Sequence, residues 1–410
     1  MEKIWPLHSL ELKNPEGGQA LSDVKLVWQG LHICAAGTNK ENGDQWLVDL
    51  PVAQAFITPM AYNITRDQLF PKDTPRGNWY AKILTDIIQN PSDEPVEFEI
   101  EGKSNYKKAI ILNTIDAWYG HSLLSLFNVE KLIKSKEEGT ALIVIIQPFL
   151  KWLIPKEGID EIWVANIPLK RGVSYFSSLN NRIIHELQRF DEVYLSNPPV
   201  QPQVIEINRF TGVKPYCFNH PPARPRITFI WREDASRIWS RSWFLTGVLK
   251  YFKAEKLFLP VQFFRVKNLF KRLERLLGHQ YSFTVAGMGK FGKFNGNIED
   301  KRVNTFTPEV EREVCRIYAE SVLVVGIHGS SLILPSGHAG MTISIMPKRR
   351  WGNFGQDVLY NSNKQFQEEV FDKRILPIEV GNDELANIIE HMINFRDGFR
   401  LRFIEHNAQL

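Results

Sequence analysis

The sequence predicts an α/β protein with two parallel-sheet domains that face a central cleft, and with a β-rich N-terminal portion. Two stretches, 107–196 and 226–380, alternate short apolar strands with helices, which is typical of parallel sheets covered by helices. The segment between them, 196–225, holds seven prolines and is the best linker candidate. These observations place two α/β domains on either side of a proline-rich hinge.

The domain boundaries follow from where the pattern changes. The expected N-terminal domain is 1–222, in which 1–105 reads as short strands broken by turns and 107–196 as α/β. The expected C-terminal domain is 223–380, and 381–410 forms a closing helix and tail. Ligands of open parallel sheets bind beyond the carboxyl ends of the strands, so functional residues are expected there.

Hydrophobic periodicity assigns the individual elements in chain order. Short apolar runs bounded by turn residues are read as strands, and apolar repeats at helical spacing as helices. The expected strands are 24–28, 31–37, 46–50, 98–102, 107–113, 141–146, 161–166, 192–196, 226–232, 281–287, 321–327, 342–347 and 375–380. The expected helices are 121–134, 176–190, 261–277, 307–320 and 383–397, with a short helix after 327.

Composition limits the function classes without naming one. The 410 residues exceed one ordinary core, and a formal charge of +4 gives no reason to expect a nucleic-acid partner. The three cysteines are widely spaced, which argues against a disulfide framework and a cysteine-based zinc site. We find neither a signal-like start nor an apolar run of about 20 residues, so we expect a cytoplasmic protein without a transmembrane segment.

The stretch VLVVGIHGSSLILPSGHAG passes from an apolar strand, Val322–Ile327, into small polar residues. His328 and the residues after it stand where a helix should begin, and helix starts offer unpaired N–H groups to a phosphate. A tight, capped crossover would use the same residue types, so both interpretations stay open. The residues assigned to an anionic ligand here are Gly329, Ser330, Ser331, Ser336, Gly337 and His338.

The segment IWREDASRIW carries charge directly after an apolar strand. Glu233 and Asp234 can supply a base, a nucleophile or ligands for sugar hydroxyls, and Arg232 or Arg237 can pair with a carboxylate or phosphate. A surface salt-bridge cluster that caps the next helix is the alternative. Asp234 and His328 both follow strands of one sheet, so we expect them to face the same ligand.

The segment VAGMGKFGKFNG contains a G-x-G-x-x-G pattern at Gly287, Gly289 and Gly292. A dinucleotide-binding fingerprint needs a helix that opens at once, and the polar sequel KFNGNIEDKRVN does not predict one. We therefore reject NAD binding. The loop can still turn Lys290 toward an anion, although a plain loop explains the same residues.

A third polar segment, NTIDAWYGHSLL, follows the strand 107–113 in the first domain. Asp116, Tyr119 and His121 precede a helix, which suggests a pocket on the acceptor side. A histidine at a helix start is also a common cap, so His121 has two interpretations.

Missing motifs narrow the chemistry further. The chain has no D-x-D, H-E-x-x-H, P-loop or G-x-S-x-G pattern, so we expect no metal and no cofactor. The helix 261–277 is amphipathic and basic. It can rest on anionic lipid as a peripheral membrane contact, or cover the sheet with a solvated basic face.

The combination of two Rossmann-like domains, a hinge and no metal motif resembles the GT-B glycosyltransferases. VVGIHGSSLILP is similar to the G-x-H-G-[AS] turn of several such families, which lies near the donor nucleotide. Together with WRED and SGHAG, it looks most like the bacterial retaining β-Kdo transferases. That resemblance implies transfer of Kdo from CMP-Kdo to a glycan or lipid-linked glycan in lipopolysaccharide O-antigen or capsule synthesis, without a metal.

The resemblance also implies roles for the residues. Asp234 would be the nucleophile of a double displacement, the serines would hold the donor phosphate, and an arginine would meet the Kdo carboxylate. The residues predicted to be catalytic are Asp234, Glu233, His328 and His121. Those predicted to bind substrate or nucleotide are Arg232, Arg237, Gly287, Gly289, Lys290, Gly329, Ser330, Ser331, Ser336, Gly337 and His338.

Two alternatives stay open at this point. One is a transferase of the same fold that uses a UDP- or GDP-sugar with a general base. The other is a carbohydrate-binding module that keeps the fold without turnover. The sequence leaves the acceptor sugar, the linkage and the oligomeric state undetermined.

Overall fold

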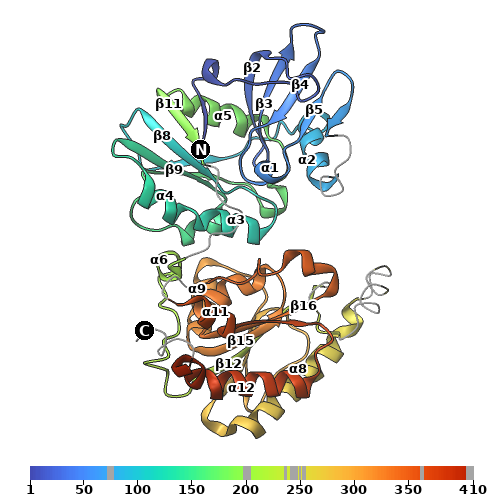
Figure 1. The fold of residues 1–410 in the computed structure, drawn as a ribbon, viewed down its shortest axis with the longest axis vertical. Coiled ribbons are helices and arrows are strands. Elements are labelled where there is room, and N and C mark those ends of the chain that lie inside the picture. Colours follow the sequence, from blue (N-terminus) through green and yellow to red (C-terminus); the bar gives the residue numbers. More distant parts are fainter. Residues whose placement is uncertain are drawn as a thin grey trace. The chain divides into compact units, whose positions relative to one another are not determined.

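The chain folds into two compact units, Met1–Pro202 and Gln203–Leu410 (Figure 1). The sequence places this boundary later, after residue 222. In the computed structural model the segment after 204 packs within the second unit, where the Tyr216 N–H donates to the carbonyl of His338. The structure describes residues 1–71, 78–196, 205–234, 238–240, 248, 251, 255–360 and 364–402.

The second unit is built on one six-stranded sheet in which every neighbouring pair of strands is parallel. The order is β14–β13–β12–β15–β16–β17, which is the 3-2-1-4-5-6 order of a Rossmann fold when the strands are numbered along this unit. The strands are β12 (Arg226–Trp231), β13 (Ser282–Met288), β14 (Ile298–Val303), β15 (Ser321–Ile327), β16 (Met341–Met346) and β17 (Lys373–Pro377).

Helices cover both faces of this sheet. On one face α8 (Leu259–Leu277) and α12 (Asn382–Arg400) pack side by side over a core that includes Phe229 and Val325 (Figure 1). On the other face α9 (Pro308–Ala319) and α10 (Ile333–His338) cover the side chains that alternate with these. α8 therefore covers the sheet, as one of its two interpretations predicts. The shorter elements are α6 (Ile207–Thr211), α11 (Phe366–Asp372), η5 (Glu255–Phe258), η6 (Gly278–Gln280), η7 (Ser330–Leu332) and η8 (Lys348–Asn353).

The first unit contains a second parallel sheet, with β11, β8, β9 and β10 at its centre. Two antiparallel strands close its edges, β1 beside β11 and β7 beside β10. β7 reads as part of the β-rich portion in the sequence, yet it pairs here. The strands are β1 (Glu2–Trp5), β7 (Phe98–Glu101), β8 (Lys108–Asn113), β9 (Thr140–Ile146), β10 (Glu161–Ala165) and β11 (Glu192–Leu195). The helices are α3 (Tyr119–Phe127), α4 (Val129–Ser135), α5 (Ser177–Leu187), η2 (Pro148–Leu153) and η3 (Leu169–Arg171).

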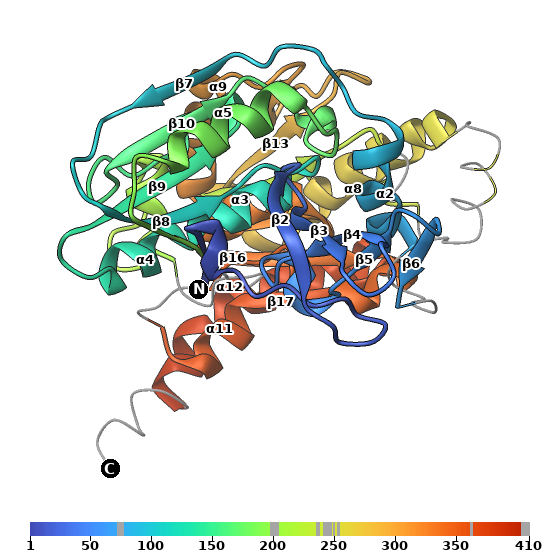
Figure 2. The same cartoon turned by 90° about the horizontal axis from the view of Figure 1, so that it is seen from above.

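The N-terminal β-rich portion forms a separate antiparallel sheet of five strands in simple meander order (Figure 2). Its strands are β2 (Leu21–Trp28), β3 (Ile33–Asn39), β4 (Gln45–Asp49), β5 (Ala61–Asn63) and β6 (Gln68–Phe70). The short helices η1 (Leu7–Ser9) and α1 (Gln54–Ile57), and the longer α2 (Asn78–Gln89), complete this part. The α/β class and the β-rich start predicted from the sequence are thus confirmed.

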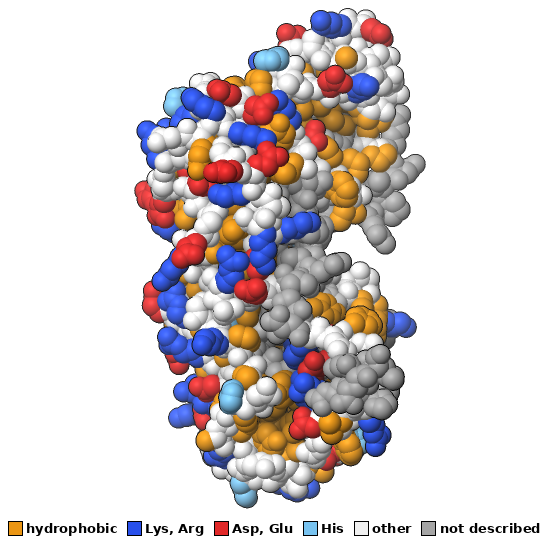
Figure 3. Space-filling view, turned by 60° about the vertical axis from the view of Figure 1, so that its left-hand side comes forward, with side chains coloured by type: hydrophobic (Ala, Val, Ile, Leu, Met, Phe, Trp, Pro, Cys, Tyr) orange, Lys and Arg blue, Asp and Glu red, His pale blue; other side chains and the backbone are white. Residues whose placement is uncertain are grey.

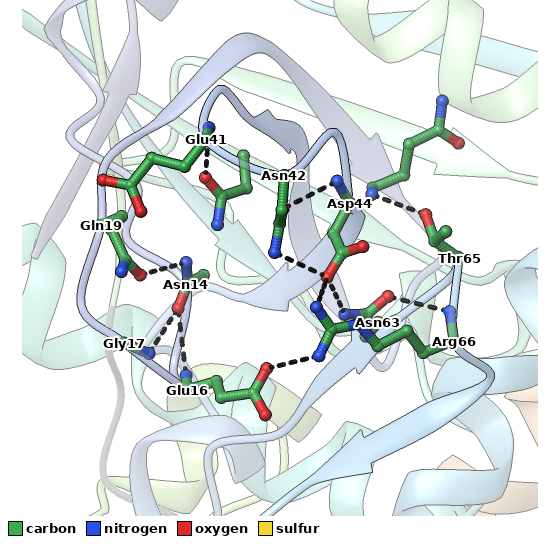
Figure 4. Close-up of polar contacts among 12 residues, drawn as sticks. Asn14, Glu16, Gly17, Gln19, Glu41, Asn42, Asp44, Asn63, Thr65 and Arg66 are labelled. Carbon is green, nitrogen blue, oxygen red and sulfur yellow. Dashed lines mark hydrogen bonds and ion pairs between the residues drawn. The ribbon is translucent and has the colours of Figure 1, made fainter.

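A buried carboxylate joins the turns of this antiparallel sheet (Figure 4). The Asp44 Oδ2 accepts hydrogen bonds from the side-chain amides of Asn63 at 3.0 Å and Asn42 at 3.1 Å, and lies 2.7 Å from the Arg66 Nη2. Arg66 also reaches Glu16 at 3.4 Å. Because one charge serves three partners, the network fixes the turns against the segment that precedes β2.

Three side chains of types that can coordinate a metal ion lie close together inside the first unit: His32, Cys34 and Asp49. They form a hydrogen-bonded cluster in which the Asp49 Oδ1 lies 2.7 Å from the His32 Nδ1 and accepts from the Cys34 thiol at 3.1 Å. The other ring nitrogen of His32 faces the carbonyl of Tyr80 at 2.9 Å. Each of these atoms has a hydrogen-bond partner in the protein, so the cluster is accounted for as a buried polar network.

None of the described helices has the length and hydrophobicity required to cross a bilayer.

Candidate functional site

The central feature of the second unit is the point where its strand order reverses. β12 and β15 are neighbours, with Ile230 paired to Gly326, while the chain leaves them toward opposite edges of the sheet. In open α/β sheets this divergence opens a crevice at the carboxyl ends of the two strands, where ligands bind. The segments that leave these two ends begin at Arg232 and His328. Both polar segments predicted from the sequence therefore lie at one edge.

After β15 a buried carboxylate that the sequence analysis missed organises the turn. Asp357 accepts hydrogen bonds from the Gly329 N–H at 3.1 Å and the Ser344 hydroxyl at 2.7 Å, both on Oδ2. Its Oδ1 lies 2.9 Å from the His328 Nδ1. The His328 side chain is 6% exposed. The two atoms are close, but they do not meet in hydrogen-bond geometry, so Asp357 and His328 form a close contact between a carboxylate and an imidazole and not a hydrogen-bonded pair.

The helix start expected at this turn is shorter than predicted. Ser330–Leu332 forms a 3-10 turn, and the α-helix begins only at Ile333 and has six residues. The Gly329 N–H already donates to Asp357, so this member of the N–H groups proposed to bind a phosphate is already hydrogen-bonded. Gly329 has a φ of 144°, a conformation that favours glycine. Ser330 and Ser331 are half-buried at this edge.

The second small-residue turn lies at the other end of α10. The Gly340 N–H that follows it donates to the carbonyl of Ser321, the first residue of β15, which places this turn at the amino edge of the sheet. The Ser336 hydroxyl accepts from the Leu359 N–H at 2.8 Å, and Ser336 and Gly337 line a cavity of about 90 Å³ beside Lys373. The structure does not bring these residues to the carboxyl edge.

His338 is fully buried at the end of this turn. Neither ring nitrogen has a hydrogen-bond partner among the described residues. Burial disfavours the charged form and lowers the pKa of His338 to about 3, so the ring is neutral at physiological pH. His338 is therefore a core residue here, in contrast to its predicted ligand role.

After β12 the chain is fixed by its neighbours. The Arg232 Nε donates to the Asp234 Oδ1 at 2.8 Å, and the Asp234 side chain is 41% exposed. The buried amide of Gln262, on α8, donates to the Arg232 carbonyl at 2.9 Å and accepts from the Trp239 N–H at 2.8 Å. The Asp234 side chain is therefore at the surface, while the hydrogen bonds of the buried Gln262 fix the backbone near it. Arg237, the other predicted arginine, lies outside the described residues.

Glu233 anchors the glycine loop that follows β13. Its Oε1 accepts from the N–H groups of Lys290 at 2.6 Å and Phe291 at 2.7 Å, and from the Trp231 indole at 3.0 Å. This use of the carboxylate favours a positioning role for Glu233 over a catalytic one. The Lys290 side chain itself is exposed.

The glycines of this loop make the close approach to β12 possible. A Cβ on Gly289 would stand 2.3 Å from the Glu233 Oε1, and one on Gly287 would stand 2.4 Å from the Trp231 carbonyl oxygen. Both have positive φ angles, 142° and 106°. The chain passes from β13 through this loop to β14 without a helix, so the local structure lacks the helix of a dinucleotide fingerprint.

Arg302 closes the loop from the other side. Its guanidinium donates to the carbonyls of Phe291 at 2.7 Å and Gly292 at 2.8 Å and pairs with Asp300 at 2.7 Å. Sequence reasoning missed Arg302, Gln262 and Asp357 because nothing in their local sequence shows that they reach distant segments.

The first unit holds a second polar group, at the carboxyl end of β8. The Asp116 Oδ2 lies 3.2 Å from the His121 Nδ1, while its Oδ1 accepts from the Trp118 N–H at 3.0 Å. The Asp116 side chain is 9% exposed and the His121 side chain 50%. This pair, which we call the Asp116–His121 dyad, combines an accessible imidazole with a buried carboxylate that orients it.

We expect the pKa of His121 to fall when Asp116 is replaced by asparagine. Burial alone lowers this pKa, but the hydrogen bond and charge of Asp116 outweigh it and raise it above 6.5. The imidazolium therefore stabilises the fold below about pH 6.5, and this contribution is lost as pH rises through the raised pKa. NMR titration of the ring nitrogens measures the pKa; an unchanged value in Asp116→Asn would contradict the assigned pairing.

The protein therefore consists of two α/β units. The second unit is a Rossmann fold, and polar residues lie at its switch point, where the strand order of the sheet reverses. No family model and no curated protein matches the sequence. Solved structures with a similar fold include an E. coli ADP-heptose lps heptosyltransferase II (8% identity, TM-score 0.40, covering 71% of this chain and 99% of that one), TarM (10%, 0.26, 99% and 79%) and the trehalose-6-phosphate synthase OtsA (10%, 0.29, 78% and 87%). At such low similarity, a functional interpretation must come from this chain's own residues.

Proposed function

We propose that the protein is a glycosyltransferase that moves a sugar from a nucleotide-activated donor to a glycan acceptor. One observation supports this above the others: the polar segments after β12 and β15 meet at the switch point of a 3-2-1-4-5-6 sheet. One segment offers a carboxylate with its arginine, and the other offers small hydroxyl residues with an imidazole. That combination suits a sugar phosphate, which needs donors for its anion and a carboxylate near its reacting carbon.

The donor phosphate would lie against the turn after β15. Ser330 and Ser331 would donate hydroxyl hydrogen bonds to it, and His328, which lies beside Asp357, would face the departing phosphate through Nε2. This assignment differs from the sequence prediction in two ways. The Gly329 N–H serves Asp357 instead, and Ser336, Gly337 and His338 take no part because they lie at the opposite edge of the sheet.

Asp234 would be the nucleophile of a double displacement. Its carboxylate would bond to the anomeric carbon as the bond to the nucleotide phosphate breaks, and an acceptor oxygen would then displace it, so that configuration is retained. A donor that carries its own carboxylate, such as CMP-Kdo, would compete with Asp234 for Arg232 and release Asp234 for attack. This chemistry favours an acidic sugar. The acceptor hydroxyl would give its proton to solvent as it displaces Asp234.

Calorimetry with CMP, UDP and GDP tests the donor assignment. We expect CMP to bind most tightly to the full chain, and we expect added CMP-Kdo to release CMP faster when a lipopolysaccharide-derived glycan is present. Tightest binding of UDP or GDP would replace Kdo transfer with the alternative transferase reading. Binding of no nucleotide, with no CMP release with or without acceptor, would refute the transferase proposal and favour a carbohydrate-binding module.

A further inference from the structure

Two tryptophans stand exposed beside the Asp116–His121 dyad, although large aromatic side chains are usually buried. Trp79, at the start of α2, and Trp118, immediately before α3, each expose 42% of their surface. Their ring centroids lie 5.0 Å apart at an interplanar angle of 84°. Perpendicular indoles form a corner, and a flat ring-shaped ligand can enter it with one face against an indole.

The corner is held in place by buried neighbours. Trp79 contacts the ring of Tyr80 at 5.5 Å, and Tyr80 is 1% exposed and stacked on the buried ring of His32 at 3.8 Å. Trp118 is fixed through its backbone N–H, which donates to Asp116. A preordered aromatic surface loses little conformational entropy when it binds a ligand. Figure 3 shows that hydrophobic side chains gather on part of the surface in this view.

The aromatic corner and the dyad are contiguous. The Trp118 and His121 ring centroids lie 5.4 Å apart, and Asp116 contacts both residues through different oxygens. A ligand on Trp118 therefore brings its polar edge to the exposed His121. A pyranose ring has this dual character, with C–H groups on one face and hydroxyls around the rim. Asp116 offsets the charge of the His121 imidazolium, so the dyad carries no net positive charge to attract an acidic sugar, and a neutral sugar fits it better.

We propose that Trp79 and Trp118 form the platform that holds the acceptor, a neutral pyranoside whose C–H face stacks on the Trp118 indole and whose edge lies against Trp79, while a hydroxyl approaches His121. The assignment of this sugar as an acceptor rests on the proposed transferase function. The binding of the sugar itself needs no donor. It places the acceptor on the first unit's own side chains, independent of the nucleotide residues of the second unit.

Saturation-transfer NMR on the full chain, without nucleotide, tests the platform with methyl glycosides of glucose, galactose and mannose. We expect transfer to the ring C–H protons of at least one glycoside, and affinity about tenfold lower in Trp118→Ala and in Trp79→Ala, the scale of one lost aromatic contact. Trp351→Ala is the matched control, because Trp351 is 43% exposed and stacked on Phe354 in the second unit. It should bind as the wild type does.

The outcomes separate the two proposals. No transfer to any of the three glycosides, or equal transfer in Trp118→Ala and the wild type, overturns the platform whatever the nucleotide results are. CMP affinity measured on the same variants should stay unchanged, which also shows that the second unit remains folded. Glycoside binding that depends on Trp118, in a protein that binds no nucleotide, would keep the platform and refute the transferase.

Discussion

Replacing Asp234 with asparagine should lower sugar transfer about a thousandfold or more, while nucleotide affinity stays within about twofold. The substitution keeps the shape of the side chain and removes the negative charge that would attack the anomeric carbon. Asp234 is exposed, so its loss should cost little stability. Initial rates of CMP release with acceptor, together with calorimetry, measure the two quantities separately.

Glu313→Gln is a suitable control for this variant. Glu313 is an exposed acid on α9 that pairs with Arg316 at 2.7 Å, so the substitution removes a comparable surface ion pair away from the switch point. Its transfer rate should equal that of the wild type. Unchanged turnover in Asp234→Asn would remove Asp234 from the mechanism, and loss of nucleotide binding in that variant would assign it to the donor pocket instead.

Replacing Asp357 with alanine should weaken nucleotide binding by roughly ten- to a hundredfold and lower the free energy of unfolding by about 2–4 kcal/mol. The buried carboxylate accepts from Gly329 and Ser344 and lies against His328. Its removal leaves a half-buried N–H and a buried hydroxyl without an acceptor and releases the turn that would hold the phosphate. Calorimetry and chemical denaturation measure the two effects.

Ser344→Ala isolates the smaller part of this network. It removes one hydroxyl and leaves Asp357 with Gly329 and His328, so we expect about 1 kcal/mol of lost stability and unchanged nucleotide affinity. Nucleotide affinity that is also unchanged in Asp357→Ala would show that the turn after β15 does not bind the donor.

The central strands could be predicted from sequence because their burial is complete. All seven residues of β15 are buried, and such a run without alternation indicates a strand covered on both faces. β14 escaped prediction because its residues, IEDKRV, are polar and half-exposed at the edge of the sheet. α2 was missed because the preceding strands and turns led us to read the whole of 1–105 as β-rich.

The location of the candidate site could be predicted from the sequence, but the sequence could not show which of the predicted residues lie in it. His328 and His338 look alike in sequence, each beside glycine and serine, and both are buried, yet His328 lies 2.9 Å from a carboxylate at the carboxyl edge and His338 lies at the amino edge. Local sequence gives which strand a residue follows. It does not give the distant groups, such as Asp357, that decide whether the residue is available.

The hydrogen bonds by which Glu233 fixes the loop after β13 have an evolutionary consequence. Two of its three hydrogen bonds go to main-chain N–H groups, which any residue except proline supplies. The side chains at 290 and 291 can therefore change without loss of this anchorage, provided that the glycines beside them remain. Such a loop lets related chains diverge in the ligands they recognise while its path stays constant.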